Sequence, residues 1–132
     1  MCGLRHLFHG LTSAGVAAEH YADLLAQDKE CRRKIDALEA AMERAKEAKA
    51  TAGTTWVELR TKLIALRQTD PDEQSTEAQT LAVEVAVAED AYRDASDTVK
   101  DRRKAIDRND EQLKRVQSQI DALRGALFAS CL

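Results

Sequence analysis

The chain has 132 residues and a formal net charge of −3 at pH 7; 33% of its residues are charged and 4% are aromatic. This length suits one ordinary domain, and so few aromatic side chains argue against a deep globular core and favour long helices. The nearly balanced charge argues against nucleic acid or an acidic lipid surface as an obligatory partner.

The first eighteen residues, MCGLRHLFHGLTSAGVAA, space their apolar side chains along a helix and are interrupted by His6 and His9. They contain neither a signal-peptide core nor the roughly 20 apolar residues of a membrane-spanning helix. We therefore predict a short helical segment over residues 1–11 and no membrane span. The expected location is the cytoplasm, or the inside of a virion or another assembly after synthesis in the cytoplasm.

Cysteine and histidine side chains gather near the chain ends. Cys2, His6 and His9 would share one helical face, and Cys131 could complete a tetrahedral zinc shell with them or form a disulfide with Cys2. This spacing matches no zinc finger, and three cysteines are an odd number for a secreted disulfide scaffold. We predict no metal and no cofactor, and an inert buried thiol at Cys31.

Two long stretches, 12–67 and 71–130, repeat apolar residues at steps of three and four, the heptad spacing of a coiled coil. Each repeat forms a narrow apolar seam that requires a partner helix. The first seam, interrupted by Asp28 and Lys49, contains Tyr21, Leu24, Cys31, Ile35, Leu38, Met42, Ala45, Ala52, Trp56, Leu59, Leu63 and Leu66. The second, interrupted by Arg102 and Asn109, contains Leu81, Val85, Ala88, Tyr92, Ala95, Val99, Ile106, Leu113, Val116, Ile120, Leu123 and Leu127.

The only proline, Pro71, separates the two stretches. Asp70 is suited to cap a helix that begins at Pro71, which leaves a turn near 68–70. A start at Thr76, with Gln79 completing a capping box, is the alternative. With either start, the fold class is all-α: a single domain over residues 1–132 that forms an antiparallel two-helix coiled-coil hairpin and assembles into a helical bundle.

The two helix starts predict two registers of the hairpin. A start at Pro71 places Asp28 opposite Asn109, so that polar meets polar. The later start places Asp28 against Val116 and Asn109 against Ile35. Because an unpaired buried polar group costs about 1 to 3 kcal/mol, the first register is preferred.

Two charged regions could bind partners. The carboxylates of Asp70, Asp72 and Glu73 form an acidic tip; a hairpin with such a tip resembles, in shape alone, the coiled-coil regulators that enter the RNA polymerase secondary channel, but helix capping accounts for these acids. In the preferred register the second region is a basic belt, although acidic residues interleave it and favour a solvated, salt-bridged face. The belt contains Arg32, Arg33, Lys34, Arg103, Lys104 and Arg108.

The apolar stripe widens toward the chain termini, whereas the turn end is expected to carry only a narrow seam and charge. One neighbouring helix cannot cover so wide a stripe, and uncovered apolar surface usually marks an interface. The predicted partner-binding or oligomer-forming residues are Leu4, Leu7, Leu11, Tyr21, Leu25, Leu127 and Phe128.

The sequence therefore favours a non-enzymatic structural or adaptor subunit of a larger protein assembly. Helical hairpins of this size occur in phage particles and secretion systems, which is an analogy of shape. The expected partner is another copy or another protein, and no catalytic residues are predicted. The alternative is a regulatory or inhibitory module that acts on a polymerase, a nuclease or another protein through the acidic tip or the basic belt.

Overall fold

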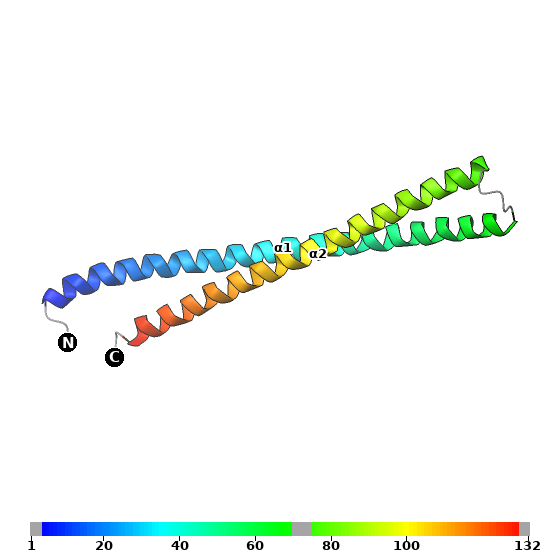
Figure 1. Cartoon of the computed structure of the whole chain (residues 1–132). Helices are drawn as coiled ribbons and strands as arrows, with labels where there is room; N and C mark the ends of the chain where they lie inside the picture. The colour runs from blue at the N-terminus through cyan, green and yellow to red at the C-terminus, as the bar shows by residue number, and fades with distance from the viewer. Residues whose placement is uncertain (1–3, 70–74, 130–132) are drawn as a thin grey trace. The chain divides into compact units, whose positions relative to one another are not determined.

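The structure is a computed structural model that describes the backbone of residues 4–69 and 75–129 and the side chains of residues 15–69 and 75–126. It contains two long helices, α1 (Leu4–Thr69) and α2 (Thr76–Ala129), which run antiparallel and pack against each other (Figure 1). Within the described residues there is no strand. The prediction of an all-α helical hairpin is confirmed.

Helix α1 begins earlier than the sequence predicts. Residues 4–11 are the start of α1 and not a separate segment, because the helix continues from Leu4 through Gly10 and Gly15 without a break. A glycine inside a helix costs about 1 kcal/mol relative to alanine. That cost is small beside the packing that a long heptad seam provides over many turns.

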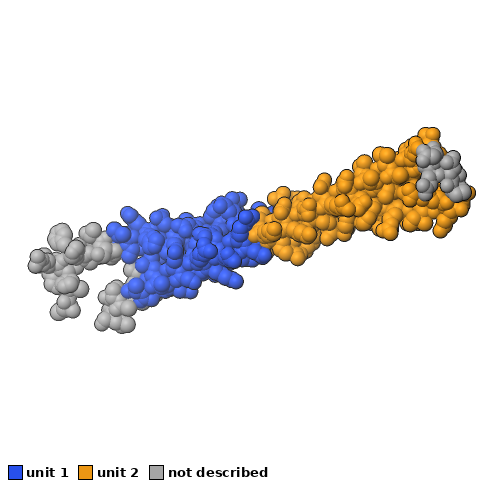
Figure 2. Space-filling view, in the orientation of Figure 1, with its two compact units in different colours: residues 1–37, 106–132 blue, residues 38–105 orange. Residues whose placement is uncertain are grey.

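The chain divides into two compact units, which Figure 2 shows in different colours. Unit 1 contains residues 1–37 and 106–132, and unit 2 contains residues 38–105. Each unit therefore holds one part of α1 and the part of α2 that packs against it.

Unit 1 has an apolar core built from both helices. Leu24 of α1 and Val116 of α2 are each only 1% exposed, and Ile120 is buried beside them. Tyr21 and Leu123 pack against this cluster from its edge. The Arg124 guanidinium donates a hydrogen bond of 2.8 Å to the Tyr21 hydroxyl, which ties the two helices together above the core.

Unit 2 has a core of smaller side chains together with one aromatic pair. The rings of Trp56 and Tyr92 stack across the two helices with centroids 5.4 Å apart and planes inclined by 29°. The buried apolar residues of this unit are Met42, Ala45, Leu63, Ala78, Ala88 and Val99. Across both units, every predicted seam residue that the structure describes is buried or half-buried, so both seams are confirmed.

Helix α2 begins at Thr76, five residues after the predicted start at Pro71. The Ser75 hydroxyl accepts a hydrogen bond of 3.2 Å from the Ala78 backbone N–H, and the Ser75 carbonyl accepts one from Gln79. Ser75 is therefore the N-cap, one residue before the Thr76 of the alternative prediction. The predicted cap Asp70 and the other acidic tip residues, Asp72 and Glu73, lie outside the described residues.

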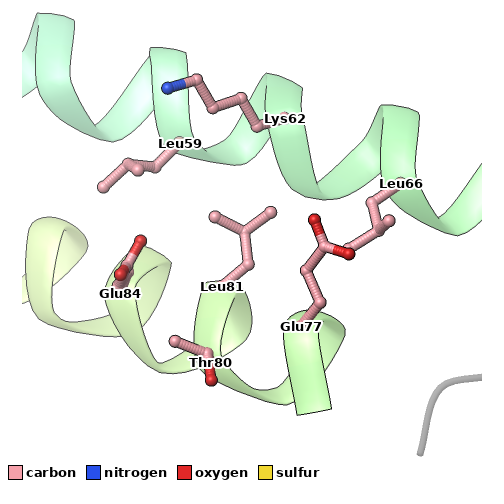
Figure 3. Close-up of a pocket in the computed structure, with 7 residues that line it drawn as sticks. All are labelled: Leu59, Lys62, Leu66, Glu77, Thr80, Leu81 and Glu84. Carbon is pink, nitrogen blue, oxygen red and sulfur yellow. The ribbon is translucent and has the colours of Figure 1, made fainter. Parts of the chain in front are cut away.

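The preferred register is wrong in both units. In unit 1, Asp28 lines a groove with Gln117, which lies about 12 Å along the helix from Asn109. In unit 2, Leu81 lies beside Leu59 and Leu66, as Figure 3 shows. These neighbours match the register of the later helix start.

The preferred register was chosen so that Asn109 could pair with Asp28 across the two helices. Asp28 does not need that partner, because it has one on its own helix. Its carboxylate accepts a hydrogen bond of 2.9 Å from Arg32 Nε, one turn along α1, and the Asp28 side chain is still 21% exposed to solvent. The two registers differ by one heptad, and a shift of one heptad keeps seam facing seam. The seams alone could not choose between them.

Candidate functional site

Most of the predicted terminal interface lies outside the described side chains. This holds for Leu4, Leu7, Leu11, Leu127 and Phe128, and equally for the metal candidates Cys2, His6, His9 and Cys131. Two members of the interface are described. Tyr21 packs against the core of unit 1, and Leu25 beside it is exposed. The terminal interface stays a prediction.

The predicted basic belt is divided between the two units. Arg32, Arg33, Lys34 and Arg108 belong to unit 1, whereas Arg103 and Lys104 belong to unit 2. The belt was predicted because the preferred register places residues 32–34 of α1 opposite residues 103–108 of α2, and the structure does not adopt that register.

Two of the belt arginines are engaged within α1. Arg32 pairs with Asp28, and Arg33 forms a two-pronged ion pair with Glu30, whose shortest N–O distance is 2.6 Å. The hydrogen bond from Arg33 lowers the pKa of the Glu30 carboxyl below its ordinary value of 4.5. The same bond raises the pKa of Arg33. These arginines are neutralised by their own helix.

Unit 2 contains a groove that the sequence did not predict. It has a volume of about 370 Å³ and lies between the two helices over Gly53 and the Tyr92 ring. Because Gly53 has no side chain, the ring edge approaches α1 closely and leaves the space open. We call this the basic groove; its lining residues are Lys46, Lys49, Ala50, Gly53, Tyr92, Val99 and Arg103.

Each ring of the aromatic pair has a cation over it, and the Tyr92 ring of that pair lines the groove. The Lys49 ammonium lies 5.8 Å from the centroid of the Tyr92 ring, and the Arg60 guanidinium lies 6.0 Å from that of Trp56. Cation–π contacts of this kind hold the positive charge over the ring faces. The aromatic pair is thus in contact with two cations, of which Lys49 lines the groove.

The positive charge of the groove is only partly neutralised. Lys46 pairs with Glu43 at 3.4 Å, and both side chains are well exposed, so solvent weakens that pair. In the described part of the chain, neither Lys49 nor Arg103 has an ion pair within 4 Å. The groove can therefore accept a carboxylate or another anion.

Two further grooves are less distinctive. One, of about 470 Å³ in unit 2, has an apolar floor of leucines with Lys62, Glu77 and Glu84 at its rim, and Figure 3 shows Leu81 pointing from α2 toward α1. The other, of about 370 Å³ in unit 1, contains the pair Asp28–Arg32 and the bonded Arg124. Both mix charges of opposite sign, so neither selects an anion or a cation.

Large apolar side chains are exposed along both helices. Their exposed fractions run from 43% for Leu25 to 64% for Val83, and the set contains Val16, Leu25, Val57, Ile64, Val83 and Val87. Four of these six lie in unit 2, where the sequence had indicated only a narrow seam and charge. Val57 and Ile64 are seven residues apart and lie outside the main seam. This heptad spacing could have predicted a second apolar strip on α1 from the sequence.

The described residues contain neither a cluster of metal-binding side chains nor a helix able to cross a membrane. No group of three or more histidine, cysteine, aspartate or glutamate side chains is placed to hold a metal ion there. No described helix has the length and apolar content needed to cross a membrane.

Comparisons with protein-family models, with curated proteins and with solved structures returned no match. The function must therefore be inferred from the surfaces of the hairpin itself.

Proposed function

We propose that this protein is a non-enzymatic structural or adaptor subunit of a larger protein assembly, such as a phage virion or a secretion apparatus. The observation that supports the proposal is the exposure of six large apolar side chains on a fold that has a single seam between two helices. Two helices cannot cover their own outer faces. Apolar surface outside the seam is stabilised when another protein covers it.

The proposed docking site is the terminal end of unit 1. Val16 and Leu25 are exposed there, near the start of α1. The sequence adds Leu4, Leu7 and Leu11 before them and Leu127 and Phe128 near the end of α2. The partner is a further copy or a different protein, and the complex forms in the cytoplasm or inside the particle.

Mass measurement by light scattering over a concentration series tests this proposal. Substitution of Leu11, Leu25 and Phe128 by serine should lower the fraction of associated protein, while Ala26→Ser with Ala122→Ser, at exposed positions of unit 1, should not. Circular dichroism verifies that each variant stays helical. A chain that is monomeric at every concentration and captures no partner from its source cell would contradict the proposal.

The second candidate is a regulatory or inhibitory module that acts on a polymerase, a nuclease or another protein. Only Arg103 supports it, since this predicted belt residue lines the basic groove. Asp72→Ala with Glu73→Ala separates the two functions, because loss of a cellular phenotype with association intact would favour regulation through the acidic tip.

A further inference from the structure

We infer that hairpins of this chain also associate side by side, with the outer face of α2 in one copy lying in the basic groove of the next copy. This contact uses unit 2 and is independent of the terminal docking proposed above. It assigns to the groove a specific occupant, a second copy of the same chain.

The groove side supplies positive charge and an apolar strip. Lys49 and Arg103 border the groove without an ion pair in the described structure, and Lys46 has only the exposed Glu43. Ala50 lines the groove, and Val57 follows it by one heptad and Ile64 by two. Residues one heptad apart lie on nearly the same strip of a helix, so two exposed apolar side chains continue the groove along α1.

The outer face of α2 supplies the complementary pattern. Six exposed residues follow one another at steps of three and four, which places them on one face of the helix. The first two are apolar and the next four are acidic. We call them the acidic face: Val83, Val87, Asp90, Asp94, Asp97 and Asp101.

The acids of this face have no ion pair in the described structure. The nearest basic residue to Asp90 in sequence is Arg93, and it pairs instead with Glu89 at 2.6 Å. Four carboxylates three and four residues apart repel one another. A positive surface brought against them removes that repulsion and neutralises the groove at the same time.

The spacings of the two surfaces agree. On α2, Asp97 lies ten residues after Val87, or about 15 Å along the helix axis. On α1, Lys46 and Lys49 lie eleven and eight residues before Val57, or about 12 to 16 Å. Suppose that α2 of one copy runs antiparallel to α1 of the next and that Val87 contacts Val57. Asp97 then lies at the level of Lys46 and Lys49.

Charge and geometry favour a second copy over nucleic acid. The Tyr92 ring already stacks on Trp56 and has the Lys49 ammonium over it, so the ring is a poor platform for stacking a base. The chain itself is net negative, at −3. The required acids and valines are present on the same unit as the groove.

The predicted contact joins two different surfaces. Such a heterologous contact repeats from copy to copy and closes into a ring or extends as an open row, depending on the rotation between copies. The side-by-side arrangement would place several hairpins with their turn ends in the same direction.

A charge-swap experiment tests the inference on the full chain. The groove variant carries Lys46→Glu and Arg103→Glu, and the face variant carries Asp94→Lys and Asp97→Lys. All four side chains are exposed, so the helices should remain intact. The matched control, Glu47→Lys with Glu58→Lys, changes the net charge as the face variant does but at exposed positions of α1 outside both surfaces.

Association is measured by sedimentation at about 0.05 M and about 0.5 M NaCl, because salt screens exposed charges. We expect wild type and control to associate at low salt, with an affinity that falls about tenfold at high salt. Each reversed variant alone should associate at least about tenfold more weakly than wild type. Mixing the two should restore an alternating complex, since each reversed surface then meets an opposite charge.

Three outcomes would overturn the inference. They are a wild-type chain that stays monomeric at low salt, reversals that leave association unchanged, and a mixture that does not recover association. Loss caused by the groove variant and not by the face variant would overturn it as well, because an acidic surface other than the acidic face would then occupy the groove. Failure of terminal docking is distinguishable, because the leucine and phenylalanine variants above remove an apolar contact that does not weaken with salt.

Discussion

The ring of Tyr92 on α2 lies against the backbone of Gly53 on α1, with its Cε2 atom 3.2 Å from the position that a Cβ would take. This approach is closer than side chains normally allow. It lets the ring stack on Trp56 and forms the floor of the basic groove. A glycine that is unfavourable within a long helix therefore allows the close packing of the facing aromatic residue.

Gly53→Ala should produce almost no net change in the free energy of unfolding. Alanine is favoured over glycine in a helix by about 1 kcal/mol, but its methyl group must displace the Tyr92 ring, whose stacking is worth about 0.5 to 1.5 kcal/mol. In a Tyr92→Leu background, where the ring is absent, the full gain should appear. Urea denaturation of the four proteins measures this difference, and equal effects of Gly53→Ala in both backgrounds would show that the ring does not resist the methyl group.

Ser75→Ala should destabilise the start of α2 by about 1 kcal/mol, since the hydroxyl that accepts the Ala78 N–H is lost. Ser75→Asp should retain most of the stability, because its carboxylate can accept the same bond. Thermal unfolding followed by circular dichroism gives the comparison. Thr76→Ala is the control, and a larger loss there than at Ser75 would mean that Thr76 is the true cap.

Leu24→Ala should cost about 2 to 5 kcal/mol, because this side chain is 1% exposed and its removal leaves a cavity beside Val116 and Ile120. The neighbouring Leu25 is the matched control. It is 43% exposed, so its change to alanine should cost much less, within about 1 kcal/mol. Chemical denaturation of the two variants measures the loss of stability. Similar losses at both positions would contradict the orientation of α1, in which Leu24 faces α2 and Leu25 faces solvent.

Arg33→Gln should return the pKa of Glu30 toward its ordinary value of 4.5, because the lowered pKa results chiefly from the hydrogen bond that Arg33 donates. A carboxyl with a lowered pKa in the folded state adds stability that is present above the unfolded-state value and is lost as the pH falls through the folded-state value. Wild type should therefore lose this contribution on acidification below about 4.5, and the variant should lack it at every pH. Side-chain NMR titration of Glu30 gives the pKa, and an unchanged value in the variant would assign the shift to another group.

The burial pattern could be predicted from the sequence, whereas the register could not. Leu24, Cys31 and Val116 are buried because heptad spacing alone places them on the facing stripes of two helices. A shift of one heptad preserves that stripe. The choice then rested on pairing Asp28 with Asn109, and it failed because Arg32, one turn away, satisfies Asp28 within its own helix.

The basic groove could not be predicted from the sequence either. Lys46, Lys49 and Arg103 are separated by up to 57 positions in the sequence, and only the observed register brings the two lysines beside the arginine. The cavity itself depends on Gly53 lying opposite Tyr92. A cross-helix pairing of this kind is a property of packing, not of local residue preference.

Two long helices with one apolar seam each follow from the residue pattern alone, because helical periodicity and the cost of exposing apolar side chains are local and add up along a stripe. The start of α2, the pairs of residues that face each other and the cations near Tyr92 depend on the packing of the two helices. Those features depend on contacts between residues distant in the chain. Two registers one heptad apart bury nearly the same apolar surface, so only contacts of particular side chains distinguish one register from the other.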